Sequence, residues 1–212
     1  MNGYVRDAAA LARKDLLLEL RGRDTLPAML LFVVAMLVAF RFALPAEQEG
    51  AAEGLLWVAI VFTALLGLTR AFVPEREQGV LEALVLAPCD RSAIWLGKAI
   101  SVLTFLVLVE AIAVPAFWLF FAPLGWTALA AILLADVGIC AVGTLLAAMA
   151  VAGRARELLM PLLFLPLAIP IVIGGVGATV VDEPARYLGF LALYDTVFAI
   201  LAWATFEYVV VE

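Results

Sequence analysis

The 212-residue sequence contains no histidine and only two serines and two cysteines. Without histidine, this chain alone cannot form a zinc protease site, a Ser-His hydrolase site or a histidine-ligated haem site. Cys89 and Cys140 form no Cys-x-x-Cys motif, so they are interpreted as structural thiols and no metal site is expected. A P-loop is also missing, because Ala99 follows Gly97-Lys98 and no glycine stands five residues before Gly97. Any ATP hydrolysis must therefore be carried out by a separate polypeptide.

Charged residues are scarce as well. They make up 15% of the chain against 67% hydrophobic residues, and the mean hydropathy is +1.14, which exceeds what a water-facing surface can carry. Crossing roughly 30 Å of hydrocarbon takes about 20 apolar residues, and the sequence contains six such runs. They lie at about 27–44, 54–72, 94–121, 126–151, 158–180 and 187–211. We therefore predict an all-α membrane protein in which residues 1–212 form a single polytopic transmembrane domain. The net charge of −6 argues against nucleic acid as a partner.

The basic residues predict how the six spans are oriented. Lys and Arg are retained on the cytoplasmic side of a membrane, and eleven of the thirteen basic residues fall in the amino-terminal segment or in and directly beside the second and fourth connections. Of the other two, Arg186 lies in the fifth connection and Arg41 near the outer end of the first span. Both termini are therefore expected in the cytoplasm, with six spans between them.

Residues 1–25 are predicted to form an amphipathic helix at the cytoplasmic interface. Apolar residues at spacings of three and four share one face, and basic residues crowd another. The apolar face consists of Val5, Ala9, Ala12, Leu16 and Leu20. Two interpretations follow: the helix is a positively charged anchor for the first span, or it is a lateral elbow that positions that span.

The connection between the second and third spans, residues 73–97, is the longest polar stretch of the chain. Pro74, followed by acids, is typical of the first turn of a helix, and Pro88 would end that helix. The apolar residues at helical spacing between the two prolines are Val80, Leu81, Leu84 and Val85. Such a short amphipathic helix either rests on lipid headgroups or docks in a groove of a soluble partner.

Three acidic residues, Glu110, Asp136 and Asp195, interrupt the third, fourth and sixth spans. A charge in the middle of a bilayer costs about 2.5 to 3.5 kcal/mol on insertion scales, so these side chains must face protein or water, or take up a proton. Few basic residues are available within the membrane as partners. The acids either form hydrogen bonds between helices or line a substrate path or a subunit interface.

The fifth span contains three prolines, Pro161, Pro166 and Pro170, followed by a glycine-rich stretch. Each interior proline removes a backbone hydrogen bond and clashes with the preceding turn, so a kinked or broken span is expected. Such a span either faces protein or a cavity, or is kinked for packing alone. The sequence leaves open whether residues 170–186 form a re-entrant element.

The Tyr194-Asp195 pair raises one enzymatic alternative, an intramembrane aspartyl enzyme. The second half of that signature, Gly-x-Gly-Asp, is missing, because Ala178 follows Gly175-Val-Gly177. No catalytic residue is therefore predicted.

Six spans with both ends inside, an interfacial amino-terminal helix and a helical loop after the second span resemble the membrane subunit of an ABC exporter, in which that loop is the coupling helix. Several segments resemble the CcmB family, haem exporter protein B, and together they extend over nearly the whole chain. These segments are 14–21 (KDLLLELR), 54–57 (GLLW), 75–82 (EREQGVLE), 86–92 (LAPCDRS), 96–98 (LGK) and 156–162 (RELLMPL). The combined order of the segments is specific to the family.

The resemblance implies a permease subunit of the bacterial inner membrane, not an enzyme, that works in cytochrome c maturation with a separate ATPase, CcmA. The other implied partners are the haem-handling membrane protein CcmC, the small protein CcmD and the haem chaperone CcmE, with two copies of this chain per complex. Haem would be a cargo of the complex and not a cofactor of this chain. Either haem passes through this subunit, or ATP hydrolysis releases the haem-loaded chaperone. The second mechanism is favoured, because the sequence shows no obvious haem pocket. An exporter half for another amphipathic or lipid cargo is the runner-up.

The resemblance also places the contact with the ATPase in the second connection. Residues 75–87 would receive the closing motion of the ATPase, and charged residues in and after this segment would dock the partner. The candidate coupling residues are Glu75, Arg76, Glu77, Gly79, Leu81, Glu82, Leu84 and Arg91.

Overall fold

The computed structural model describes residues 2–22, 25–45, 49–77, 79, 90–152, 156–181 and 183–211. The described residues form helices and no strand. The helices are α1 (Asn2–Gly22), α2 (Thr25–Ala43), α3 (Glu49–Arg70), α4 (Val73–Glu77), α6 (Arg91–Phe120), α7 (Trp126–Ala152), α8 (Arg156–Val180) and α9 (Pro184–Val211). Six of them, all but α1 and α4, are long and apolar enough to cross a membrane. The predicted all-α membrane fold with six spans is thus confirmed.

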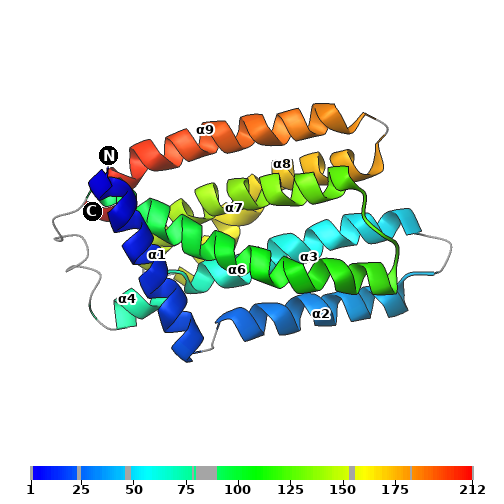
Figure 1. Ribbon diagram of the computed structural model, residues 1–212, viewed down its shortest axis with the longest axis horizontal. Helices are drawn as coiled ribbons and strands as arrows, with labels where there is room; N and C mark the ends of the chain where they lie inside the picture. The colour runs from blue at the N-terminus through cyan, green and yellow to red at the C-terminus, as the bar shows by residue number, and fades with distance from the viewer. Residues whose placement is uncertain are drawn as a thin grey trace.

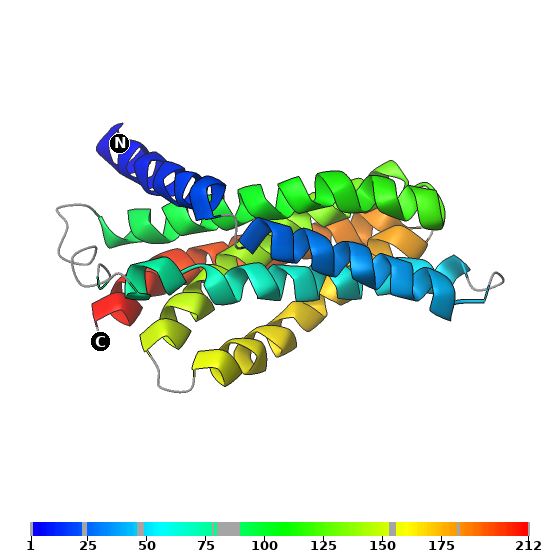
Figure 2. The same cartoon turned by 90° about the horizontal axis from the view of Figure 1, so that it is seen from below.

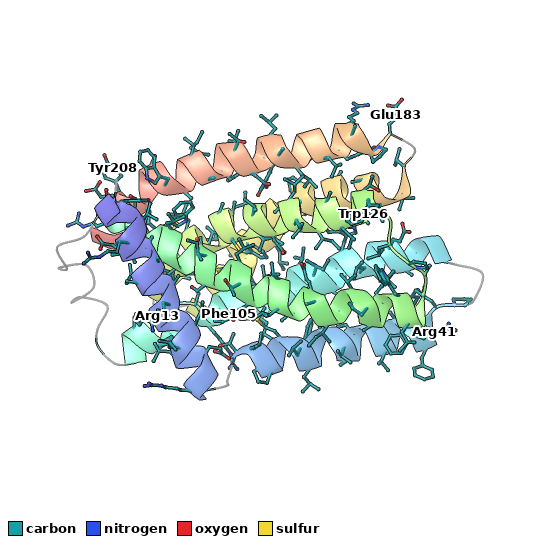
Figure 3. The ribbon with its side chains drawn as sticks, viewed as in Figure 1. Arg13, Arg41, Phe105, Trp126, Glu183 and Tyr208 are labelled. Carbon is teal, nitrogen blue, oxygen red and sulfur yellow. The ribbon has the colours of Figure 1, made fainter. Side chains whose placement is uncertain are left out.

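The six long helices run side by side, and the polar elements gather at one end of the bundle (Figure 1). Both termini and α4 lie at this end, the α1 end, whereas α2, α6 and α8 finish at the opposite end. Arg13 and Tyr208 lie at the α1 end, and Arg41, Trp126 and Glu183 lie at the opposite end (Figure 3). The basic amino-terminal segment and the second connection therefore meet on one side of the bundle.

Helices α3 and α7 form the centre of the bundle. In the most apolar stretch of each span, 67% of the residues of α7 and 61% of those of α3 are buried, against 17% for α2 and 22% for α9. Gly143 of α7 allows this close packing, because a Cβ atom there would lie 2.3 Å from Cδ1 of Leu68 on α3. In the peripheral helices α2 and α9, most residues of the apolar stretch are not buried by protein, which suits a surface that faces lipid.

Helix α8 is continuous from Arg156 to Val180 in spite of its three internal prolines, so it is not broken. It runs obliquely to the other spans (Figure 2). Its glycine-rich end packs on α3: a Cβ atom on Gly175 would lie 2.5 Å from the indole of Trp57, whose Nε1 donates to Oγ1 of Thr179 at 3.2 Å. Residues 170–180 thus continue the span, and α9 begins at Pro184.

Helix α1 lies across α6 at the α1 end (Figure 2). The helix is present as predicted; of the predicted apolar face, Ala12 is buried, whereas Val5 is 63% exposed and Ala9 is exposed. The face that packs on α6 contains Ala8, Leu11 and Ala12, and a Cβ atom on Gly97 of α6 would lie 2.8 Å from Cβ of Leu11. Small residues such as Ala8 and Ala12 lie in this face because the two helices approach closely there.

Candidate functional site

A buried group of charged side chains joins α1, α4 and α6. Nζ of Lys98 on α6 lies 2.9 Å from Oδ2 of Asp15 on α1 and 2.8 Å from Oε1 of Glu75 on α4. It also donates to the carbonyl oxygen of Ala71 at 2.7 Å. An ammonium group can donate three hydrogen bonds, so three oxygens at these distances match its capacity. Phe72 adds a cation–π contact, with its ring centre 5.0 Å from Nζ of Lys98.

Lys14 of α1 completes this group, which we call the α1–α4–α6 joint (Lys14, Asp15, Glu75 and Lys98). Its ammonium donates to Oε1 of Glu75 and lies 3.1 Å from Oδ1 of Asp15. Burial alone would lower the pKa of Lys14, but the hydrogen bond with Glu75 and the two nearby negative charges outweigh it and raise that pKa. Lys14 therefore stays protonated, and two lysines face two acids in the joint.

Local capping holds the elements around the joint in place. Oε1 of Glu19 accepts hydrogen bonds from the backbone N–H groups of Thr25 and Leu26, each at 2.7 Å, and so caps the start of α2. Asp90 caps α6 by accepting from the N–H of Ser92 at 2.9 Å. Each cap satisfies N–H groups that a helix start leaves unpaired, which fixes α2 and α6 relative to the joint.

A cavity of ≈ 920 Å³ lies beside the joint. Its polar lining comes from the joint and its surroundings, including Asp15, Glu19, Arg21 and Lys98. Its apolar lining comes from the central helices and α8. These apolar residues include Leu68, Val102, Phe105, Ala147 and Met160. The cavity is thus amphipathic, with charged groups of α1 in its lining.

Glu110 of α6 and Asp136 of α7 lie next to each other inside the bundle and interact electrostatically. Glu110 is 8% exposed, Asp136 0% and Asp195 of α9 6%. Oε1 of Glu110 and both side-chain oxygens of Asp136 and Asp195 have no hydrogen-bond partner among the residues that the structure describes. Asp195 packs against Gly138 of α7, where a Cβ atom would lie 2.4 Å from its Oδ1. Of the three acids, Glu110 and Asp136 are therefore the two that interact with each other.

The proline region of α8 contacts α9 next to Asp195. The hydroxyl of Tyr194 donates to the carbonyl oxygen of Leu167, between Pro166 and Pro170, at 2.8 Å. Tyr194 thus holds α9 against α8, which is a packing role.

The profile of the CcmB protein family matches residues 6–211. The chain belongs to the CcmB family. Three relatives, each called "Heme exporter protein B", come from Rhodobacter capsulatus, Pseudomonas aeruginosa and Paracoccus denitrificans. Their identities to this chain are 32% over 174 residues (78% of this chain and 79% of the relative), 32% over 158 residues (70% and 70%) and 34% over 150 residues (66% and 68%), respectively. The sequence resemblance is confirmed, and the chain is a multi-pass membrane protein with the role of a transport subunit.

The predicted coupling residues of this CcmB chain fall into three groups. Glu75 lies buried in the joint, while Arg76 and Glu77 continue α4. Gly79 is exposed with a φ of 64°, a left-handed conformation that favours glycine. Arg91 begins α6 and pairs with Glu207 of α9 at 3.5 Å. Leu81, Glu82 and Leu84 lie outside the described residues.

Sequence reasoning missed three members of the joint, Lys14, Asp15 and Lys98. The two lysines were used to predict orientation and stood in segments that resemble the family, but neither was predicted to form an ion pair. Lys98 carried a usable signal, because it stands inside the third predicted span, 94–121, where an ammonium group needs an acidic partner. The partners, on two other helices, were not predictable from spacing.

Proposed function

We propose that this chain is the permease subunit of a haem export complex for cytochrome c maturation, and that it passes the closing motion of a separate ATPase into its membrane helices. Its family and the names of its relatives support haem as the cargo of the complex. The single observation that carries the coupling mechanism is the α1–α4–α6 joint, in which Glu75 of α4 pairs with lysines from α1 and α6.

The joint supports a rigid transfer of motion. Taking one partner out of a buried ion pair costs about 3 to 5 kcal/mol, so α4 cannot move far without taking α1 and α6 with it. A push on the segment that follows α4 then shifts α6 along its length. Candidate coupling residues beyond α4, among them Glu82, contact the ATPase in this mechanism.

In this proposal the chain spans the bacterial inner membrane, and the α1 end lies on its cytoplasmic side. Its support is the concentration of basic residues in the amino-terminal segment and the second connection. The partners are a CcmA-like ATPase, a CcmC-like haem-handling protein, a CcmD-like small protein and a CcmE-like chaperone, with two copies of this chain because an ABC exporter needs two membrane halves. We favour release of the haem-loaded chaperone over passage of haem through the subunit, since the chain has no histidine to ligate haem.

The test is a pull-down of the tagged chain from its native membrane in mild detergent, with mass spectrometry of the retained proteins. We expect an ABC ATPase together with a haem-handling membrane protein, and recovery of no ATPase would contradict the proposal. Glu82→Lys should insert normally but retain less ATPase. Its matched control is Glu183→Lys, which changes an exposed acid at the opposite end of the bundle. Equal ATPase recovery by both variants would sink the docking role of Glu82.

A second candidate function, an exporter half for another amphipathic or lipid cargo, is favoured by the amphipathic cavity beside the joint. Deletion of the gene separates the two. Accumulation of apocytochromes without haem supports the haem complex, whereas normal haem attachment with loss of a lipid or another amphiphile from the outer side supports the second candidate.

A further inference from the structure

Three acids lie in one layer of the bundle. Glu110 stands ten residues before the end of α6 at Phe120, Asp136 ten residues after the start of α7 at Trp126, and Asp195 eleven residues after the start of α9 at Pro184. These three helix ends lie at the same end of the bundle (Figure 1). At 1.5 Å per residue, all three acids lie roughly 15 Å from these helix ends, measured along the helix axes. Of the three acids, Glu110 and Asp136 are the ones that interact.

The carboxyl oxygens of this pair need a hydrogen-bond donor or a bound cation. Oε1 of Glu110 and both carboxyl oxygens of Asp136 are buried without a hydrogen-bond partner among the described residues. Two adjacent carboxyl groups resist ionising together, because the second negative charge is repelled by the first and neither is solvated. A buried polar atom without a partner is costly. A proton on either carboxyl removes one charge and creates an O–H group that can donate to the other.

Within the part of the chain that the structure describes, no positive side chain stands beside the pair to take the place of that proton. Cys140, one turn along α7 from Asp136, and Tyr194 and Asp195 on α9 are the other titratable groups at this depth. Among the helices packed on α6 or α7, the lysines and arginines of α2, α3, α8 and α9 stand near helix ends, at Arg41, Arg70, Arg156 and Arg186, and α7 has none. The charged residues of α1 lie in and around the joint, at the α1 end.

A metal ion fits the pair poorly. The described part of the chain contains no group of three or more histidine, cysteine, aspartate or glutamate residues that could hold one. Two carboxyl groups without a third ligand are suited to a proton.

We propose that Glu110 and Asp136 form a proton-binding site, in which at least one proton is shared by the two carboxyl groups at neutral pH. When the proton leaves, two negative charges face each other across the contact between α6 and α7 with no base to balance them. The packing of α6 on α7 therefore depends on pH. Lys98 and Glu110 lie on the same helix, α6, twelve residues apart. A change of charge at the proton-binding site therefore acts on the helix that also forms part of the joint.

Infrared spectroscopy of the full chain in lipid nanodiscs tests this site. A protonated carboxyl group has a C=O stretching band separate from the carboxylate bands, and the band shifts in D₂O. We expect this band in the wild-type spectrum minus that of the double variant Glu110→Gln, Asp136→Asn at neutral pH, and its loss from this difference at alkaline pH. The matched control Asp195→Asn, which removes the third acid of the layer, should keep the band of the pair.

Two results would overturn the proposal. In the first, the wild-type spectrum minus that of the double variant contains only carboxylate bands, which means that both groups are ionised. In the second, the acid band appears only when sodium and potassium are replaced by choline, which means that the pair binds a metal cation. Should the double variant fail to fold, carbodiimide labelling of the wild-type chain serves instead: dicyclohexylcarbodiimide modifies protonated carboxyl groups in apolar surroundings, and we expect mass spectrometry to find the adduct on Glu110 or Asp136. Recovery of both peptides without adduct, while Asp195 is labelled, would contradict the site.

Discussion

The α1–α4–α6 joint sets two lysines against two acids, whereas Glu110 and Asp136 face each other in the middle of the spans without a base. Both groups are largely buried, although the side chain of Lys14 is 40% exposed, and both join side chains from different helices. In the joint, opposite charges cancel. In the acid pair, the described residues supply no opposite charge, and a proton reduces the charge in our proposal.

The position of each group along the spans explains this difference. Near an end of the bundle, lysine side chains from α1 and α6 can reach acids with little cost of insertion. At the depth of Glu110 a lysine would be as costly as the acid, while an acid can be neutralised where it stands. The joint is therefore suited to holding elements together at any pH near neutrality, and the acid pair is suited to responding to pH.

Removing Lys98 should have the largest effect on stability. Lys98→Met leaves Asp15 and Glu75 buried close together, and we expect a loss of about 3 to 5 kcal/mol in the free energy of unfolding. Reversible unfolding in mixed micelles measures this loss. Arg186→Met, which removes an exposed basic residue at the opposite end, is the control and should change stability by less than about 1 kcal/mol. A loss for Lys98→Met no greater than that of the control would show that the joint does not hold the helices.

Neutralising one acid of the joint should have a smaller effect. Asp15→Asn removes one of the two anions around Lys98 and keeps Glu75 and the Ala71 carbonyl, so we expect a loss of about 1.5 to 3 kcal/mol, as for a hydrogen bond to a charged group. Asp7→Asn is the matched control, because Asp7 lies on α1 outside the joint. Similar unfolding free energies for the two variants would contradict the role of Asp15.

The same change in the acid pair should cost less still. Asp136→Asn replaces a group that already shares a proton, so at neutral pH we expect a change below about 1 kcal/mol. The folded wild-type protein holds a proton that the unfolded chain has released, so its stability should fall as the pH rises, while that of the variant stays more constant. Unfolding measured across the neutral-to-alkaline range checks this. Parallel pH profiles for wild type and variant would contradict the shared proton.

Much of the fold could be predicted from the sequence, because hydrophobic run length and the distribution of Lys and Arg are local signals. The six spans and the grouping of both termini at one end follow from them. The face of α1 that packs on α6 could not be predicted in this way. Ala8 and Ala12 are buried and Leu11 is partly buried because Gly97 lets the two helices approach closely, and helical spacing within α1 alone does not contain that information.

The candidate site was predictable only in part. Glu110 and Asp136 stood out because each interrupts an apolar run, but their contact depends on α6 and α7 running antiparallel at a matching depth. Glu75 was singled out by resemblance, whereas its lysine partners lie 61 and 23 residues away in the chain. Long-range pairs of this kind follow from tertiary packing and leave no local pattern.

The smallest effect on stability is expected for the exposed ion pair at the α1 end. Nη1 of Arg91 lies 3.5 Å from Oε1 of Glu207, and the side chains are 35% and 64% exposed, so breaking the pair should cost less than about 1 kcal/mol. Arg91→Gln and Glu207→Gln break the same pair and should unfold alike. Only Arg91→Gln removes a charge assigned to ATPase docking, so only this variant should lower ATPase recovery in the pull-down. Equal losses of ATPase with both variants would mean that Arg91 acts through its pair with Glu207, and equal retention would remove Arg91 from the docking surface.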